Sequence, residues 1–184
     1  GLNTVLAPVS WELIEPQEGH YDFSSLDNII VEAPVGAESV MTLPDGTKVF
    51  LNACSSLKYS QGFGINNRDV ELCGECYFEV ARNEILPFNV KSEHINVQVL
   101  GTKFNFRDYP DEMEAAVSLI EGRVALKNLV RVKDPVKYLS QNQKVVFNKT
   151  TNDMRIDSKE AEKAISWKSG VLFFDEVMLC DIAK

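Results

Sequence analysis

Two of the four cysteines, in the segment Cys73-Gly-Glu-Cys76, carry the most distinctive chemistry in the sequence. Their spacing matches that of a redox pair, so a thiol oxidoreductase is one function to weigh. A working redox pair needs a lowered thiol pKa, which a helix N-terminus usually supplies. This pair lies inside a strand pattern with no helix behind it. The pattern therefore favours two buried structural cysteines.

A metal site has little support in the sequence. A structural zinc site needs a second pair of ligands at matching spacing. Cys54 and Cys180 are isolated, and neither His20 nor His94 has a nearby ligand. We therefore predict that the protein binds no metal and no cofactor.

Acid–base and nucleotide chemistry are not indicated either. Glu71, Glu75 and Glu79 alternate with apolar neighbours, as on a solvated strand face, and a general acid–base pair would need a partner that the sequence does not place. The Gly62-Phe-Gly64 segment has Asn67 where a dinucleotide fingerprint needs a third glycine. We predict no catalytic residue and no enzymatic activity.

Composition restricts the class of protein. The chain has 184 residues, of which 45% are hydrophobic, so it can bury a core. Its formal net charge of -8 disfavours nucleic acid, whose phosphates would repel it. No apolar run approaches the roughly 20 residues that span a bilayer, and no signal-peptide pattern opens the chain. We expect the sequence to be an excised soluble piece of a longer protein.

From Ile29 onward, strand signals recur about every ten residues with no helical period between them, which predicts an all-β fold rather than βαβ units. Pro44-Asp45-Gly46-Thr47 predicts a hairpin turn, and Glu121-Gly122 predicts another. Sandwich, barrel and β-solenoid all fit. The prediction is a β-solenoid-like or sandwich-like stack of short antiparallel strands and hairpins.

The character of the sequence changes near its C-terminal end. Asp157-Ser-Lys-Glu160 forms a capping box, which predicts a short helix to about Trp167. A strand at Val171 to Phe174 and a helix capped by Asp175 follow. The predicted division is a lead-in segment (1–28), an all-β domain (29–156) and a linker helix with the beginning of a truncated second domain (157–184).

Several sequence blocks resemble those of the FecR-type anti-sigma regulators. Leu72 to Val80 resembles the L-x-G-E-A-Y-F-E-V segment, and Leu100 to Asn105 resembles L-G-T-x-F-N. Cys76 departs from the family, which usually has Ala there, and Ala to Cys leaves a strand intact. Further blocks in the family order are Ile29 to Gly36, Leu43 to Tyr59, Arg68 to Leu72, Pro87 to Val90, Glu121 to Val124, and Trp167 with Gly170 and Phe173-Phe174.

The resemblance implies that residues 29–156 are a FecR-type domain and that residues 157–184 begin an STN-like domain. It further implies a periplasmic region of an inner-membrane protein. Such a region senses the signalling domain of a TonB-dependent outer-membrane transducer. A cytoplasmic segment, absent here together with the membrane helix, acts on an extracytoplasmic-function (ECF) sigma factor. The expected function is signal relay by protein–protein interaction.

We interpret the recurring motif as scaffold. Its glycines suit turns, and its short polar side chains can bond turn backbone. The partner surface would then lie on a sheet edge or at the junction with the second domain, although the sequence assigns no partner-binding residue. The scaffold residues are Gly46, Gly101, Gly122, Asp45, Asn52 and Thr102.

An extracellular carbohydrate-binding β-protein is the alternative function, because short repeated strands also build such folds. It requires an exposed row of aromatic side chains over a carboxylate-lined groove. The candidates for that row are Tyr59, Phe63, Tyr77 and Tyr109.

Overall fold

The structure, a computed structural model, describes residues 28–157 and 161–169. These ranges hold thirteen strands and one 3-10 helix, which confirms the all-β prediction. The strands are β1 (Asn28–Ala33), β2 (Ser39–Thr42), β3 (Lys48–Leu51), β4 (Ser55–Ser60), β5 (Arg68–Glu79), β6 (Phe88–Lys91), β7 (Ile95–Val99), β8 (Lys103–Asp108), β9 (Glu114–Glu121), β10 (Val124–Asn128), β11 (Lys137–Leu139), β12 (Lys144–Asn148) and β13 (Asp153–Asp157), and the helix is η2 (Ala161–Ser169).

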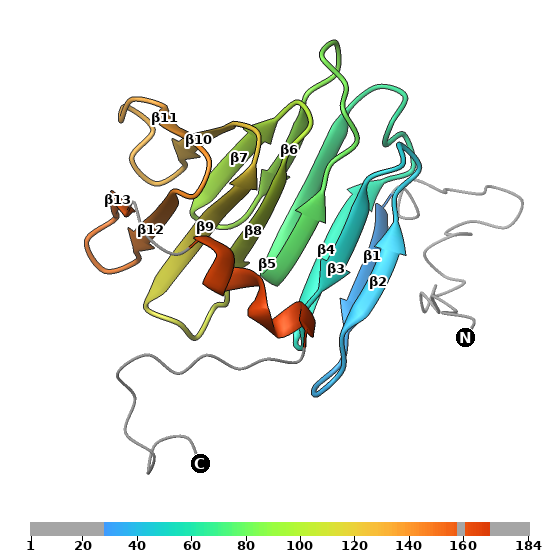
Figure 1. The fold of residues 1–184 in the computed structure, drawn as a ribbon, viewed down its shortest axis with the longest axis horizontal. Helices are drawn as coiled ribbons and strands as arrows, with labels where there is room; N and C mark the ends of the chain where they lie inside the picture. The colour runs from blue at the N-terminus through green and yellow to red at the C-terminus, as the bar shows by residue number, and fades with distance from the viewer. Residues whose placement is uncertain (1–27, 158–160, 170–184) are drawn as a thin grey trace, which may run out of the picture.

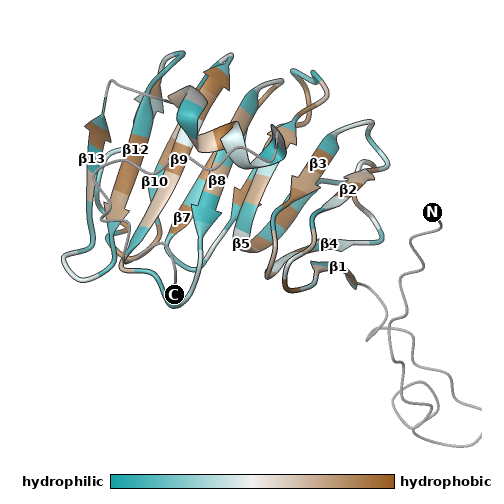
Figure 2. Ribbon diagram, turned by 60° about the horizontal axis from the view of Figure 1, so that its bottom comes forward, coloured by the Kyte–Doolittle hydropathy of each residue, from teal (hydrophilic) through white to brown (hydrophobic). Residues whose placement is uncertain are grey.

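The strands form one sheet folded over on itself into two layers that share β5 (Figures 1 and 2). Layer 1 has the order β1-β4-β5-β6-β7-β10-β11, and layer 2 has the order β2-β3-β5-β8-β9-β12-β13. Residues 68–73 of β5 pair with β4 and β6, and residues 74–79 pair with β3 and β8. The long central strand thus ties the two layers together.

Successive hairpins alternate between the layers. The predicted turn at Pro44 to Thr47 joins β2 to β3 in layer 2, with Thr42 opposite Lys48 and Gly46 at a φ of 87°. The β8–β9 and β12–β13 hairpins also lie in layer 2, whereas β6–β7 and β10–β11 lie in layer 1. Each segment between hairpins carries the chain from one layer to the other.

The predicted hairpin at Glu121-Gly122 is wrong. The β9 strand pairs with β8 and β12, whereas β10 pairs with β7 and β11, so the two strands lie in different layers. Gly122 has a φ of 99°, and a Cβ there would lie 2.9 Å from Thr102 Oγ1. Two strands joined by a tight turn have the same local pattern whether they pair or cross between layers.

The core lies between the two layers and is rich in phenylalanine. Phe78 and Phe104 of layer 2 stack with ring centroids 5.0 Å apart, and Phe78 also meets Phe88 of layer 1 at 5.9 Å. Phe63, from the loop before β5, closes this group against Phe88 at 5.9 Å. These four rings are at most 2% exposed. Burial of each contributes roughly 1.5–3 kcal/mol, so the phenylalanines bind the layers to each other.

The C-terminal part differs from the prediction in its details. Asp157 ends β13, where it pairs with Lys144 of β12, so it does not cap a helix. The helix that the structure contains is η2, which is of the 3-10 type and lies across the outer face of layer 2 (Figure 2). The predicted strand at Val171 to Phe174, the helix after Asp175 and most of the lead-in segment lie outside the described residues.

Candidate interaction surface

The two cysteines of the Cys73-Gly-Glu-Cys76 segment lie on opposite faces of β5. Side chains alternate along a strand, so residues 73 and 76 point to opposite sides. Cys73 is exposed on the outer face of layer 1, whereas Cys76 is fully buried in the core. The prediction of two buried cysteines is therefore wrong for Cys73. The structure does not bring the two thiols into one site.

We predict that Cys76 is inert towards alkylation in the native protein. Burial, with the charge of Glu75 adding to it, raises the pKa of the Cys76 thiol well above its ordinary value. Iodoacetamide at pH 7.5 should modify it at least about a hundredfold more slowly in the folded chain than in urea, as peptide mass spectrometry can measure. Exposed Cys54 is the positive control. A Cys73–Cys76 disulfide after mild oxidation would contradict this arrangement.

The buried guanidinium of Arg68 forms the first polar cluster inside the fold. Arg68 is 1% exposed, and its Nη1 lies 3.0 Å from Asp45 Oδ2 in the β2–β3 turn. Its Nε donates to the Leu86 carbonyl at 2.7 Å, and Nη1 donates to the Ala81 carbonyl at 2.8 Å. Asp45 also accepts from the backbone N–H and hydroxyl of Thr47. The cluster holds the β2–β3 turn and the β5–β6 loop to the start of β5, so its role is structural.

A second polar cluster surrounds Glu75 on the outer face of layer 2. Glu75 is 3% exposed, which corrects its assignment to a solvated strand face. Its carboxylate accepts from Asn52 Nδ2 at 2.9 Å, Asn105 Nδ2 at 2.7 Å and Arg107 Nη1 at 3.1 Å. Sequence reasoning missed this convergence. One sequence signal could have indicated this cluster: Glu75, Asn52 and Asn105 all lie in the FecR-like blocks, and only Arg107 does not.

The motif residues expected to bond turn backbone do so, with one difference. Asp45 accepts from the Thr47 N–H at 2.9 Å, and Asn52 accepts from the Ala53 N–H at 2.8 Å. Thr102 donates instead to the Arg123 carbonyl at 2.9 Å, in the segment that crosses between β9 and β10. The polar residues of the blocks therefore bind segments of the domain to one another.

The helix η2 covers the Glu75 cluster. Trp167 Nε1 donates to Asn105 Oδ1 at 3.3 Å. Lys168 Nζ lies 3.8 Å from the ring centroid of Phe50 and 3.7 Å from that of Tyr77. The same ammonium group is 3.7 Å from Glu79 Oε1. The C-terminal end of η2 thus covers part of the outer face of layer 2.

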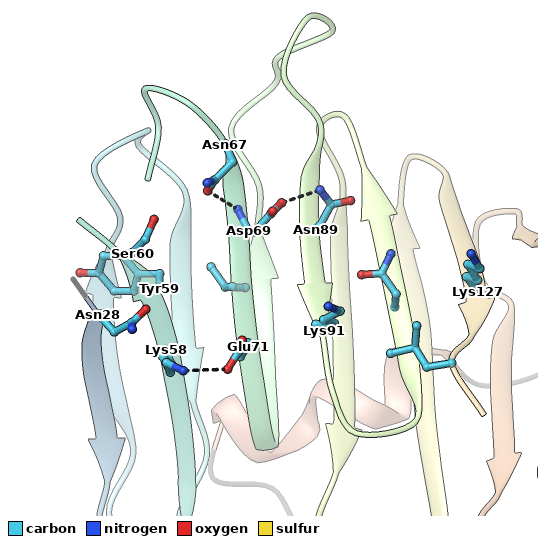
Figure 3. Close-up of a pocket in the computed structure, with 13 residues that line it drawn as sticks. Asn28, Lys58, Tyr59, Ser60, Asn67, Asp69, Glu71, Asn89, Lys91 and Lys127 are labelled. Carbon is cyan, nitrogen blue, oxygen red and sulfur yellow. Dashed lines mark hydrogen bonds and ion pairs between the residues drawn. The ribbon is translucent and has the colours of Figure 1, made fainter. Parts of the chain in front are cut away.

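The outer face of layer 1 is polar and uncovered by any element that the structure describes (Figure 3). It holds a shallow depression of about 450 Å³. Lys58 pairs with Glu71 at 3.2 Å, and Asn89 donates to Asp69 at 2.6 Å across β5 and β6. Lys91 and Lys127 also line the depression (Figure 3). These two pairs join neighbouring strands across the outer face, as polar side chains do on the solvent face of a sheet.

A third cluster ties the two layers together at one end. Asp108 of β8 is 5% exposed and lies between His94 and Lys149. His94 Nδ1, from the β6–β7 turn, is 3.1 Å from Asp108 Oδ2, and Lys149 Nζ is 2.8 Å from Oδ1. Within residues 28–157 and 161–169, no group of three or more His, Cys, Asp or Glu could hold a metal ion. The cluster is therefore a structural ion-pair network.

The four edge strands of the described fold carry exposed apolar side chains. Each of β1, β2, β11 and β13 presents one exposed large apolar side chain: Ile30, Val40, Tyr138 and Ile156, which are 50%, 55%, 71% and 47% exposed. The β2 strand, Ser39–Thr42, also contains no charged residue. An open edge strand with apolar side chains and no charge is a template for strand addition.

The aromatic row required by the carbohydrate alternative is not formed by its candidates. Tyr59, Phe63 and Tyr77 are at most 9% exposed, and Tyr109 is half-buried. Tyr109 donates to the Ala53 carbonyl at 2.8 Å and lies under the guanidinium of Arg107. These rings pack within the domain and present no stacking platform for a sugar.

This fold and its clusters define a class of β-sheet scaffold whose polar motif residues hold the domain together. The family model described as FecR protein matches residues 30–125, which is 96 of the 184 residues. The chain belongs to the FecR protein family. A second family model, described as β-galactosidase, matches residues 1–48, of which 1–27 lie outside the described residues and 28–48 form β1, β2 and the first residue of β3.

The solved structures that are similar to this chain include the two described next, and no curated protein matches it. Both are described as crystal structures of a putative anti-sigma factor from Parabacteroides distasonis ATCC 8503, at 2.50 and 1.65 Å resolution. Each is 31% identical and covers 84% of this chain and 71% of its own, with TM-scores of 0.76 and 0.75. The similarity thus extends beyond the residues that the FecR model matches.

Proposed function

We propose that this chain is the periplasmic signal-relay region of a membrane-anchored anti-sigma factor, and that it acts by protein–protein interaction without catalysis. Membership of the FecR family carries the proposal, together with the similarity to a protein described as a putative anti-sigma factor. The region would receive a signal from the signalling domain of a TonB-dependent transducer. An ECF sigma factor would respond through a cytoplasmic segment that is not in this chain.

The distribution of ionisable groups supports a role in binding. Among the described residues, the buried carboxylates of Glu75, Asp108 and Asp45 are each bonded to cations or amides inside the domain. The Cys73 and Cys76 thiols face opposite sides of β5.

No helix in the described ranges has the length and hydropathy of a membrane span.

Partner binding would use a sheet edge or the junction after η2. The edge strands carry exposed apolar side chains, and η2 ends on layer 2 beside β3. Strand addition at an edge satisfies unpaired backbone groups on both partners. This placement would fail if the partner contacts were mapped to the middle of the outer face of layer 1, for example around Glu71 and Lys91.

A capture experiment tests the relay function. The immobilised chain should retain the N-terminal signalling domain of a TonB-dependent transducer from a periplasmic extract, identified by mass spectrometry. The edge variants Val40→Glu and Tyr138→Glu should be compared with Lys91→Gln, which changes an exposed residue of the inner strand β6. Loss of capture in one edge variant supports edge docking. The relay function would be contradicted if the immobilised chain captured only a soluble sugar, or if it captured no protein.

The carbohydrate-binding alternative has one observation in its favour, the match of residues 1–48 to the β-galactosidase model. The described part of that match, residues 28–48, is built into both layers of the FecR fold: β1 pairs with β4, and β2 pairs with β3. The candidate aromatic side chains are packed inside the domain or half-buried. The relay function therefore has the stronger support.

A further inference from the structure

The covered face of layer 2 contains a small cation-binding site. Phe50 of β3 and Tyr77 of β5 are neighbours in register, and their ring centroids are 5.7 Å apart. The ammonium group of Lys168 lies within 3.8 Å of both centroids, and Glu79 supplies a carboxylate at 3.7 Å. Two aromatic faces and one carboxylate are the groups that bind a lysine side chain. The site therefore has a defined ligand class and an occupant from the same chain.

The helix η2 depends on this site for its position. It is a 3-10 helix of nine residues, whereas runs longer than three or four residues of this type are uncommon. Its contacts with the sheet, rather than its own hydrogen bonds, must therefore hold it in place. Trp167 and Lys168 supply polar anchors at its C-terminal end, and Ala161 is buried at its start.

The sheet beneath η2 is bonded almost completely without it. Glu75 is satisfied by Asn52, Asn105 and Arg107, all from the sheet or its corners. Trp167 of η2 donates a hydrogen bond to this cluster, at 3.3 Å to Asn105 Oδ1. If η2 lifts, water can reach that oxygen and replace the bond. Release of η2 would therefore leave the bonds of Glu75 to Asn52, Asn105 and Arg107 in place.

Opening of η2 would change the nearest sheet edge. Val40, Phe50 and Tyr77 stand side by side on β2, β3 and β5, and Val40 is already 55% exposed at the edge. With η2 in place, Lys168 covers the two aromatic rings. With η2 released, the three side chains would form a continuous apolar row that ends at the uncharged edge strand β2.

We propose that Phe50, Tyr77 and Glu79 form a lysine-binding site that clamps η2 through Lys168, and that opening of this clamp exposes the apolar row of Val40, Phe50 and Tyr77. The clamp itself is inferred from the contacts of Lys168 with Phe50, Tyr77 and Glu79. Its role in signalling rests on the proposed relay function.

Fluorescence of Trp167 tests the clamp directly. A Trp11→Phe background leaves Trp167 as the remaining tryptophan of the two in the chain. In this background, Lys168→Gln should raise the fraction of released η2 about tenfold or more, because it removes the cation from two rings and one carboxylate. The measured result is stronger acrylamide quenching of Trp167 and stronger binding of the dye ANS, with an unchanged far-UV circular dichroism spectrum.

Matched variants make the test specific. Lys168→Arg keeps a cation that stacks on aromatic rings and should restore wild-type quenching. Tyr77→Leu should release η2 from the sheet side. Lys127→Gln makes the same charge change on layer 1 and should have no effect. Equal quenching of Trp167 in wild type and Lys168→Gln would overturn the clamp, whether or not a transducer domain is captured. Increased quenching without increased ANS binding would overturn the exposure of the apolar row formed by Val40, Phe50 and Tyr77.

Discussion

Replacement of Arg68 by methionine should lower the free energy of unfolding by about 3–5 kcal/mol, the cost of removing one partner from a buried ion pair. Methionine fills much of the same volume but makes none of the guanidinium hydrogen bonds. The Asp45 carboxylate, whose side chain is 8% exposed, would lose its cation. The carbonyl oxygens of Leu86 and Ala81 would lose their donors at 2.7 and 2.8 Å.

Urea denaturation followed by circular dichroism measures this loss. The matched control is Arg155→Met, because Arg155 is 71% exposed and lies 3.7 Å from Glu114. That change should stay within about 0.5 kcal/mol, as surface substitutions usually do. Asp45→Asn keeps the shape and removes only the charge, so it should fall between the two. Equal stability of Arg68→Met and Arg155→Met would show that the buried pair does not hold the loops.

Replacement of Gly74 by alanine should lower the free energy of unfolding by about 2–6 kcal/mol, since backbone strain and overpacking each cost about 1–3 kcal/mol. Gly74 stands where β5 passes from layer 1 to layer 2, at a φ of 101°. An added Cβ would lie 2.8 Å from Ser55 Cα and 2.4 Å from Ser55 Oγ. The backbone of β4 would have to move away from β5.

Gly36→Ala separates the two contributions to the Gly74 effect. Gly36 has a φ of 73°, but no atom lies within 4 Å of its added Cβ. This control should therefore lose only the conformational part, about 1 kcal/mol. Thermal or urea unfolding of both variants gives the comparison. If Gly74→Ala loses no more than Gly36→Ala, the close approach of β4 and β5 is not a constraint on the fold.

The local features of the fold were predictable from the sequence. The hairpin at Pro44 to Thr47 follows from its turn residues, and the alternating pattern of β5 predicts a strand. The pairing of the strands was not predictable from the sequence, because pairing depends on contacts between residues that are far apart in the chain. Glu121-Gly122 has the turn residues of a hairpin, yet β9 and β10 lie in different layers. The sequence around a turn does not record which layer the next strand joins.

The candidate site shows the same division between local and long-range information. Cys73 and Cys76 share a motif, but the period of a strand places them on opposite faces. Glu75 has the neighbours of a solvated strand residue, and it is buried because Arg107, Asn105 and Asn52 arrive from other strands and corners. The lysine-binding site joins Phe50 to Lys168, which are more than a hundred residues apart.

By itself the sequence determined the all-β class, the positions of the turns and the resemblance to the FecR family, because these depend on residues that are close together in the chain. Only the tertiary structure decided how the hairpins alternate between two layers, which carboxylates are buried and where η2 rests. The physical reason is that burial and pairing are properties of both sides of a contact. A strand's own residues describe only one of those sides.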